Sequence, residues 1–491
     1  MNSKHKGSLS ILPLPLGVPS DAETLSARTQ MRIAETELHK INIELVLILA
    51  RRTQILAQLN RCHLIIAPYR RLPADLVKRI MLLYFYTSTG ECFLTPKSYP
   101  PGGVQNPRLV ITQICSTWRK IAFAEKGLWD LTVTPIRRDV ELAAAWFKQS
   151  TGSKLRLTVK KSQIQFFKTT TQSFLPVSQK VIVPHSHRFS SLTLPIDESL
   201  WGSISSYSFE NLENLTFRSD DLTINSWEEI SKPIKAPLLR SVAINAQSGA
   251  IHCKILLQVP LHQLTDLKIH GKVTANDLIP VLTACASLEH CTIKNSQETE
   301  GGQKPQQRPG IPISLLHLQS FQLFFGSSAS VFLPLLRTPN LSSFSTNVDV
   351  SSHIYFPFIQ KLEKLRYIAI HKHQNAPPFV DGIFFKSIAV SKIVVIQGYT
   401  LYPSTLARIG AGELLPNLDH LDLKDTGVDL QLLYNALNTR WINAQARPGC
   451  ISHIEQVIIS DSDNREGSLT GLFEELRSKG TAVTFRYWGS I

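Results

Sequence analysis

The chain has 491 residues, of which 43% are hydrophobic and 18% are charged. These values are ordinary for a folded protein and do not suit a disordered or membrane-embedded chain. A chain of this length exceeds one ordinary core, so two or three structural units are expected, one of which can be an extended repeat array. Apolar runs such as Leu45–Ala50 are far shorter than the roughly 20 residues that span a bilayer.

The net charge of +14 favours an anionic partner, such as an acidic protein, a nucleic acid or a membrane surface. The basic residues are scattered without a run of five or more, so an acidic protein is predicted as the partner in preference to a nucleic acid. Seven dispersed cysteines without a C-x-x-C pair are typical of reduced thiols. The expected location is therefore intracellular, in the cytoplasm, the nucleus or both, and no membrane partner is expected.

Residues 1–22 are predicted to form a flexible tail, because the prolines among residues 12–16 would break a helix. Residues 23–66 are predicted to form a long amphipathic helix. From Ala27 to Leu59 its seam positions alternate in steps of four and three, and only Arg52 interrupts them with a charge. Two interpretations stay open: the helix packs on the next domain, or it self-associates as a coiled coil.

Residues 68–131 are predicted to form a small helical unit. Pro68 and Pro73 stop the long helix, and Leu76, Ile80 and Leu83 then recur at helical spacing. A loop rich in proline and glycine follows, and Leu109–Ala122 resumes the helical periodicity. The pair Leu128-Trp129 ends the unit.

The most informative feature is an internal repeat in residues 140–491. The pattern L-x-x-L-x-L, with apolar substitutes, starts at Phe189, Leu212, Leu239, Leu264, Leu288, Leu318, Leu341, Leu365, Val390, Leu418 and Ile454. The alternation predicts a half-buried strand in each copy, and intervals such as Asp277–Ala286 have room for a short helix. Stacked copies predict a curved α/β solenoid with a concave strand face.

Two further segments belong to this repeat array. Residues 295–312 are rich in Gln, Gly and Pro and are predicted to form a disordered loop. Leu469–Lys479, Gly480 and Ala482–Trp488 are predicted to be a helix, its glycine cap and a strand that closes the open end of the solenoid.

No catalytic signature is recognised in the sequence, so a non-enzyme is expected, with no cofactor and no metal. The pairs His185/His187 and His371/His373 would each place two imidazoles on one face of a strand. Two ligands do not make a metal site, so ordinary histidines are the expected reading.

Two strings carry a family resemblance. The segment Arg71-Leu-Pro-Ala-Asp-Leu-Val-Lys-Arg-Ile80 resembles the opening of an F-box, and Ile114-Cys-Ser-Thr-Trp-Arg-Lys-Ile-Ala122 with Leu128-Trp129 resembles its second half. The long insertion between them is similar to that in F-box proteins of mushroom-forming fungi (basidiomycetes), which also share an N-terminal heptad helix and irregular leucine-rich repeats. In those proteins, similar strings correspond to Trp146–Ser150 and His185–Phe189.

The resemblance implies a fold and a function. The fold is of the α/β class, with an N-terminal long helix and a small helical F-box unit followed by a leucine-rich-repeat-like solenoid. The function is that of a substrate receptor in a cullin-RING (SCF-type) ubiquitin ligase, in which the F-box docks on a Skp-type adaptor and the adaptor binds the cullin scaffold. The adaptor-binding residues would be Leu72, Pro73, Leu76, Ile80, Ile114, Trp118, Leu128 and Trp129. The alternative for Leu72, Leu76, Ile80 and Trp118 is that they form the core of a helical domain.

The protein target is expected on the concave strand face. There the residues between the leucines point away from the core, and those singled out are Asp266, Lys268, His290, Gln322, Tyr367, His420 and Asp422. Residues 68–131 carry nine Lys or Arg against four Asp or Glu, a balance of +5 that would attract an acidic adaptor. The alternative function is a repeat-based scaffold without a ligase connection.

Overall fold

The computed structural model describes residues 20–66, 72–88, 107–125, 128, 130–133, 137–150, 154–160, 174–219, 233–250, 253–295, 312–324, 329, 332–348, 355–372, 385–386, 388, 391–461 and 470–487. The chain divides into two compact units, Met1–Val77 and Lys78–Ile491. The predicted mixed α/β architecture, with a long N-terminal helix and a parallel repeat sheet, is confirmed.

The first unit is dominated by helix α1 (Asp21–Ile66), which covers the predicted helical range. It begins with a capping box, in which the Ser20 amide donates to the Glu23 carboxylate at 2.9 Å and the Glu23 amide donates to the Ser20 hydroxyl at 3.3 Å. The apolar side chains of α1 that the structure describes are exposed, and Leu38, Ile41, Leu45 and Ile48 each keep between 53% and 64% of their surface in solvent.

Three short helices correspond to the predicted helical unit: α2 (Ala74–Ser88), α3 (Pro107–Gln113) and α4 (Ser116–Ala124). The single helix expected over Leu109–Ala122 is wrong, because the chain breaks into α3 and α4. Cys115 is extended at the break and caps α4, with its sulfur accepting from the Trp118 amide at 3.4 Å. The capping group competes with helix continuation, which periodicity alone does not reveal.

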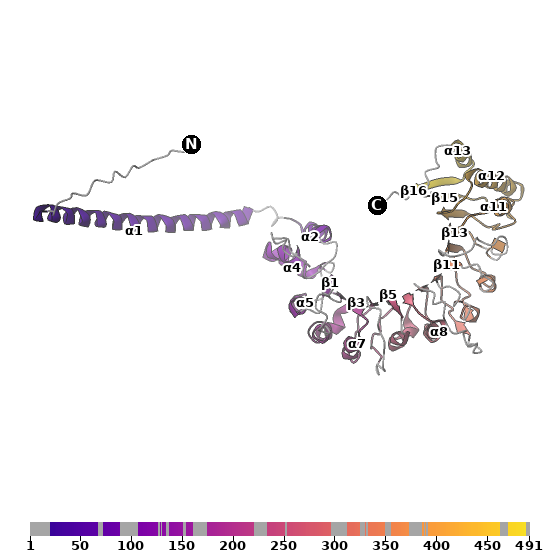
Figure 1. Ribbon diagram of the computed structural model, residues 1–491, viewed down its shortest axis with the longest axis horizontal. Helices are drawn as coiled ribbons and strands as arrows, with labels where there is room; N and C mark the ends of the chain where they lie inside the picture. The colour runs from indigo at the N-terminus through magenta and orange to yellow at the C-terminus, as the bar shows by residue number, and fades with distance from the viewer. Residues whose placement is uncertain are drawn as a thin grey trace. The chain divides into compact units, whose positions relative to one another are not determined.

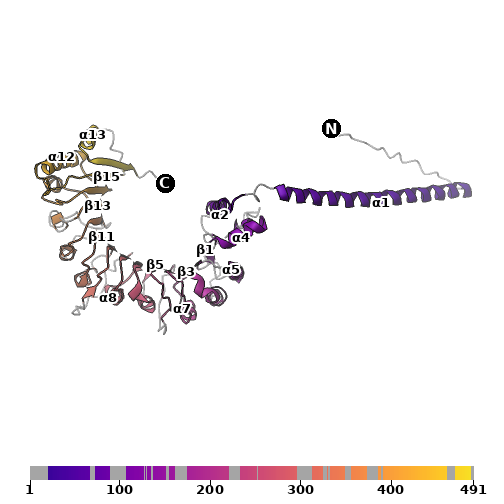
Figure 2. The same ribbon diagram turned by 180° about the vertical axis from the view of Figure 1, so that it is seen from behind.

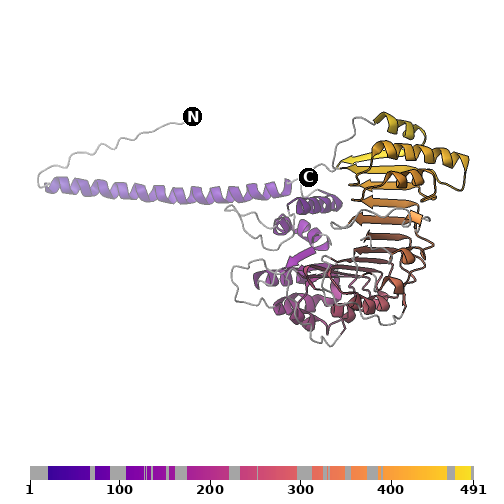
Figure 3. The same ribbon diagram turned by 45° about the vertical axis from the view of Figure 1, so that its right-hand side comes forward.

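The second unit contains a sheet of 14 parallel strands that follow chain order, with β8 and β10 forming a separate two-stranded pair. The strands of the large sheet are β1 (Asp130–Val133), β2 (Leu155–Val159), β3 (Phe189–Pro195), β4 (Asn214–Ser219), β5 (Ser241–Ala250), β6 (Asp266–Lys272), β7 (His290–Lys294), β9 (Ser320–Phe324), β11 (Ser343–Val348), β12 (Tyr367–Lys372), β13 (Ile393–Gln397), β14 (His420–Lys424), β15 (Gln456–Asp461) and β16 (Ala482–Tyr487). Within this unit the strands line the inner side of an arc (Figures 1 and 3).

The connections between strands form the outer layer of the arc, as both the front and the back views show (Figures 1 and 2). They contain α5 (Arg137–Gln149), α6 (Leu175–Val177), η3 (Ser178–Ile182), η4 (Val183–Arg188), α7 (Glu198–Ile204), η5 (Cys253–Gln258), η6 (Leu261–Gln263), α8 (Ala275–Ala284), β8 (Ile313–Ser314), η8 (Leu333–Leu335), β10 (Leu336–Arg337), α9 (Tyr355–Ile359), α11 (Pro403–Gly410), α12 (Leu430–Ala446) and α13 (Thr470–Ser478). Helix α8 confirms the short helix expected between two repeats, shifted by two residues.

Each of the eleven predicted repeat copies corresponds to one strand, from β3 to β15. In ten of them the predicted inward positions are the buried ones, for example Leu267 and Ile269 in β6. In β13 the predicted start at Val390 is wrong by one residue. Val394 and Ile396 pair with the core positions of β14, so the copy starts at the buried Ser391. The apolar run Ile393–Ile396 hides the alternation that would set this register.

Backbone bonds join the repeats just before each strand, and the side-chain amides of Asn211, Gln263 and Asn340 add bonds to the preceding copy. The Arg240 carbonyl accepts from the amides of Thr265 and Asp266, and the Thr265 carbonyl accepts from the next pair in the same way. The series continues to Glu455, whose carbonyl accepts from Ala482. The main chain therefore supplies the lateral contacts that keep the copies in register.

The predicted end of the solenoid is confirmed by α13 and β16, and β16 pairs with β15 as the last strand of the sheet. Gly480 lies between them with φ of 95°, a conformation that favours glycine. The sheet starts earlier than expected, because β1 lies before residue 140. Residues 296–311 of the predicted loop lie outside the described residues.

Candidate functional site

The seven predicted target-binding residues lie on one face of the sheet, in two rows that cross the strands. The first row contains Asp266, His290, Tyr367 and His420, and the second contains Lys268, Gln322 and Asp422. Adjacent positions in a row are about 4.8 Å apart, the usual spacing of paired strands. The structure therefore brings together residues that are up to 156 positions apart in the sequence.

Exposure differs along these rows. Lys268 and His290 are exposed and Asp266, Gln322, Tyr367 and His420 are half-buried, whereas Asp422 is only 6% exposed. In strands β12 to β15 the second-row neighbours Ala369, Val395 and Ile458 are also buried. At this end of the array the second row is therefore closely packed, with Asp422 among apolar neighbours.

Two aspartates on this face form similar ion pairs along their own strands. Asp266 Oδ2 lies 3.3 Å from Lys268 Nζ, and Asp422 Oδ2 lies 3.3 Å from Lys424 Nζ. The Oδ1 atom of each aspartate is buried and has no hydrogen-bond partner among the described residues. Each carboxylate therefore has one buried oxygen that takes no part in its ion pair.

A third row lies on the same face, at the carboxyl-terminal side of the first two. In strands β4 to β16 of the large sheet it is made of the residue that follows the last core position: Arg218, Asn245, His270, Lys294, Phe324, Asn347, His371, Gln397, Lys424, Ser460 and Arg486. The repeat pattern L-x-x-L-x-L does not include this row, because the pattern ends one residue too early. Extending the strand alternation by one position would have revealed it.

Side-chain contacts join the centre of the third row. Lys294 Nζ lies 5.2 Å from the Phe324 ring centroid, and that ring lies 5.1 Å from the His371 ring. His371 Nδ1 lies 2.8 Å from the Gln397 carbonyl oxygen, which can only accept, so Nδ1 carries the proton. His371 Nε2 then accepts from the Ser345 hydroxyl at 3.2 Å.

The electrostatic field in the third row is positive. Burial lowers the pKa of His371, and the charges of Lys424 and Lys294 lower it further, against a hydrogen bond to Gln397 that raises it. Burial, Lys294 and Lys268 lower the pKa of His270. Both imidazoles are therefore neutral at pH 7, and the lysines carry the charge.

The predicted adaptor-binding residues of α2 and its N-terminus differ in exposure. Leu72 is half-buried, Pro73 is exposed, and the Pro73 carbonyl accepts from the Val77 amide at 3.1 Å at the start of the helix. Leu76 and Ile80 are 47% and 44% exposed, whereas Val77 is 1% exposed. The core alternative is therefore wrong for Leu76 and Ile80.

The remaining predicted adaptor residues lie further along the chain. Ile114 is half-buried, but Trp118 and Leu128 are only 6% and 3% exposed, so the expectation that they are exposed anchors is wrong. The Leu128 amide donates to the carbonyl of Glu125, three residues earlier. In later repeats the amide of the first leucine makes the same bond to the carbonyl three residues before it. Leu128 is thus the first core position of the β1 copy. Trp129 lies outside the described residues.

The two other strings of the resemblance meet at one side chain. Arg188 donates from Nη1 to the Phe147 carbonyl at 2.7 Å, and from Nη2 to the carbonyl and the hydroxyl of Ser150. These contacts cap the carboxyl end of α5, where backbone carbonyls lack helical partners. His185 and His187 lie in the 3₁₀ helix η4, so the strand expected for that pair is wrong. His373 lies outside the described residues.

Other features bear on chemistry within the described residues. Burial raises the pKa of the Cys285 thiol to about 12 and that of Cys291 well above its usual value, so both are poor nucleophiles. In the part of the chain that the structure describes, no three His, Cys, Asp or Glu side chains gather as a metal site would require. No helix in the described ranges combines the length and apolarity of a membrane span.

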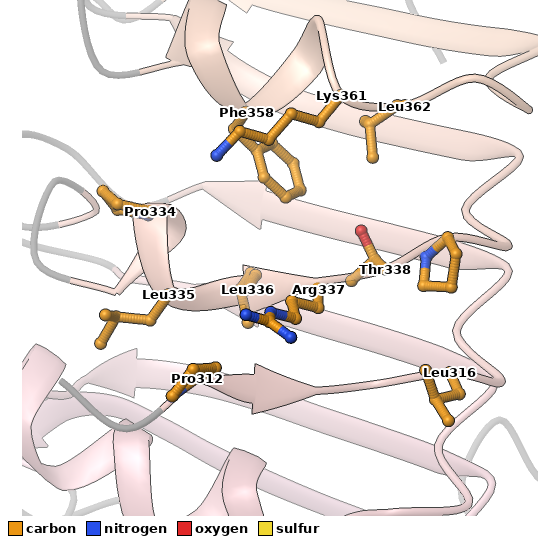
Figure 4. A pocket seen from close by; sticks show the side chains of 11 residues that line it. Pro312, Leu316, Pro334, Leu335, Leu336, Arg337, Thr338, Phe358, Lys361 and Leu362 are labelled. Carbon is orange, nitrogen blue, oxygen red and sulfur yellow. The ribbon is translucent and has the colours of Figure 1, made fainter.

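A hollow of about 500 Å³ opens between the connections that follow β7, β9 and β11. Its walls are mainly apolar and include Leu316, Leu336 and Phe358, with Arg337 and Lys361 as charged members (Figure 4). Two cations without an acid among the lining residues provide no acid and base pair for bond chemistry.

Comparisons with known proteins add little. No family model and no curated protein matches the sequence. Among solved structures, the mouse RP105/MD-1 complex is similar at a TM-score of 0.35 and 14% identity, over 74% of this chain and 64% of that chain. A structural-genomics protein of Bacteroides fragilis is similar at a TM-score of 0.29 and 13% identity, over 51% of this chain and 66% of that chain. The chain thus spans just under two thirds of each, and likenesses this weak bear on neither fold nor function.

Proposed function

We propose that this chain is a non-catalytic substrate receptor of a cullin-RING ubiquitin ligase of the SCF type. In this proposal the F-box-like segment binds a Skp-type adaptor, and the strand face of the repeat array binds the protein to be modified. It is an F-box protein of the basidiomycete type, with irregular leucine-rich repeats, and acts inside the cell. The observation that carries the proposal is the exposure of Leu76 and Ile80 on α2, within the string that resembles an F-box.

The exposed α2 residues are suited to an adaptor groove. Large apolar side chains on a short helix are stabilised when a partner covers them, and a few such anchors commonly dominate binding energy. Leu83 and Tyr84 add exposed surface on the same helix, at 67% and 41%. Trp118 and Leu128 are buried and are not part of this surface.

The competing function is a repeat scaffold without a ligase connection. Both functions use the strand face, so only the adaptor contact separates them. The decisive experiment is co-purification of the full chain with a Skp-type adaptor and cullin, comparing wild type with Leu76→Ala/Ile80→Ala and with Leu72→Ala/Pro73→Ala. We expect both variants to lose adaptor capture at least tenfold, while the circular dichroism of the repeat array is unchanged.

The matched control is Leu257→Ala/Leu316→Ala, which removes two leucines of similar exposure, 47% and 52%, from the repeat array. This control should capture adaptor like wild type. Normal capture by both the Leu76/Ile80 and the Leu72/Pro73 variants would refute the assigned docking site. If wild type captured no adaptor or cullin, the scaffold function would replace the ligase function.

We also propose that α1 associates with other copies of α1. Its seam has Leu38, Leu45 and Leu59 at one heptad position and Ile41, Ile48 and Ile55 at the other. The step from Leu38 to Ile41 is three residues and the step from Ile41 to Leu45 is four, so the leucines take heptad position a and the isoleucines take position d. This distribution favours bundles of three or four helices over dimers.

A further inference from the structure

The third row of the strand face differs from the first two in its charge. Its eleven described positions include Arg218, Lys294, Lys424, Arg486 and two histidines, and none of the eleven is acidic. The first and second rows, in contrast, contain Asp266 and Asp422. Cations are therefore concentrated along one edge of the inner face.

Lys294 is the strongest anchor in this row. Its side chain is exposed, and no described carboxylate lies within ion-pair distance of its ammonium group. The nearby Phe324 ring provides an apolar surface. The His371 imidazole beside it is held in place by its hydrogen bonds to Ser345 and Gln397. An anion bound here meets a fixed surface, so little side-chain entropy is lost on binding.

Lys424 marks the other end of the central stretch. Between Lys294 in β7 and Lys424 in β14 there are five strand spacings, so the two cations are roughly 24 Å apart. An extended peptide advances about 3.4 Å per residue, so about seven residues cover this distance. Asp425 contacts the Gln397 amide at 3.5 Å, and Asp422 pairs with Lys424 at 3.3 Å, so a bound carboxylate shares Lys424 with Asp422.

We propose that the third row binds an extended acidic segment of the target protein, which crosses the strands from β7 to β14. Carboxylates of that segment pair with Lys294 and Lys424, and its backbone lies over Phe324 and His371. This inference rests on the proposed receptor function and specifies the chemistry of the target. A polynucleotide is the other anionic partner that the charge admits, and it is an outcome of the test below.

The test measures binding of a fluorescent peptide of about seven glutamates to the full chain by anisotropy at low salt, since about seven residues span the central stretch. Wild type should bind it with an affinity that falls as salt rises. Lys294→Glu/Lys424→Gln should weaken binding at least tenfold. The control Lys361→Glu/Lys364→Gln makes the same charge change in the exposed turn before β12, and should bind within about twofold of wild type.

Three outcomes would overturn the inference: no loss in the third-row variant, an equal loss in the control, or tighter binding of a labelled oligouridylate than of the peptide. Thermal melting of both variants checks that they fold. Adaptor capture is measured on the same samples. Normal capture with no peptide binding would refute the acidic target alone, whereas lost capture in wild type would refute the receptor function.

Discussion

Arg440 shows how one buried charge can organise the carboxyl-terminal repeats. Its side chain is 1% exposed and donates to the carbonyls of Ser452, Ile409, Leu415 and Pro416 at 2.7–3.0 Å. Burial lowers its pKa to about 10, so the guanidinium remains charged at neutral pH. It links α12 to α11 and to the two connections that flank β14.

We expect Arg440→Ala to lower the free energy of unfolding by roughly 3–5 kcal/mol, because several buried carbonyls lose their donor. Chemical denaturation of the full chain measures this loss. The control Arg447→Ala removes an exposed arginine just beyond the same helix and should change stability by less than about 0.5 kcal/mol. A similar small effect at Arg440 would contradict the structural role.

We expect the His371 imidazole to make anion binding by the third row depend on pH. Its neighbours are the cations Lys294 and Lys424, the Gln397 amide that contacts Asp425, and Asp422 beside Lys424. Because its pKa is lowered, the imidazole is neutral when free. A bound anion raises that pKa, so binding takes up a proton and affinity rises as pH falls.

The acidic peptide should therefore bind more tightly at about pH 5.5 than at about pH 7.5, a window that stays above the usual carboxylate pKa values. His371→Gln should lose most of this gain while binding normally at the higher pH. His262→Gln, at an exposed histidine on the outer connection η6, is the control and should behave like wild type. An unchanged pH dependence in His371→Gln would exclude this histidine as the sensor.

At the scale of elements, α1 is the segment whose surface most requires a partner. An isolated helix in water draws little stability from its own hydrogen bonds, and packing of an apolar face supplies most of it. In α1 the five residues Leu45–Leu49 are all between 48% and 64% exposed. A bundle of copies would cover the seam positions of this stretch.

We expect wild type to sediment as three or four copies. Leu45→Glu/Ile48→Glu should shift it to a monomer, because it places carboxylates in the seam. Ile43→Glu/Leu47→Glu makes the same change at equally apolar residues outside the seam and should keep the larger species. A wild-type monomer at micromolar concentration, or dissociation of the second variant as well, would contradict the assigned seam.

At the scale of the whole molecule, the array is stabilised by stacking, and its last strand protects the strand before it. Phe473 and Leu476 of α13 and Val483 of β16 are 3% exposed or less. Arg477 links α13 to β16, because its Nη2 atom donates to the Val483 carbonyl at 2.7 Å. Without α13 and β16, the pairing edge and inner apolar surface of β15 would face water.

Deletion of residues 462–491 should therefore lower the melting temperature and produce aggregates on size exclusion. Deletion of residues 488–491 alone leaves β16 intact and serves as the control, with no expected change. If the longer deletion stayed monodisperse with the melting temperature of wild type, β16 would not act as a cap.

The sequence by itself determined the long helix, the eleven strand copies and the closing helix and strand, because each depends on a local periodicity of apolar residues. It also placed the seven target-binding candidates on one face, since strand alternation fixes the side on which a residue lies.

Only the tertiary structure decided which of those residues are accessible and what lies beside them. The register of β13, the burial of Trp118 and Leu128, and the third row with Lys294 and His371 all depend on neighbouring copies. A continuous apolar run fits either register until a paired strand selects one. Likewise, charges far apart in the sequence form a row only when parallel strands stack in register.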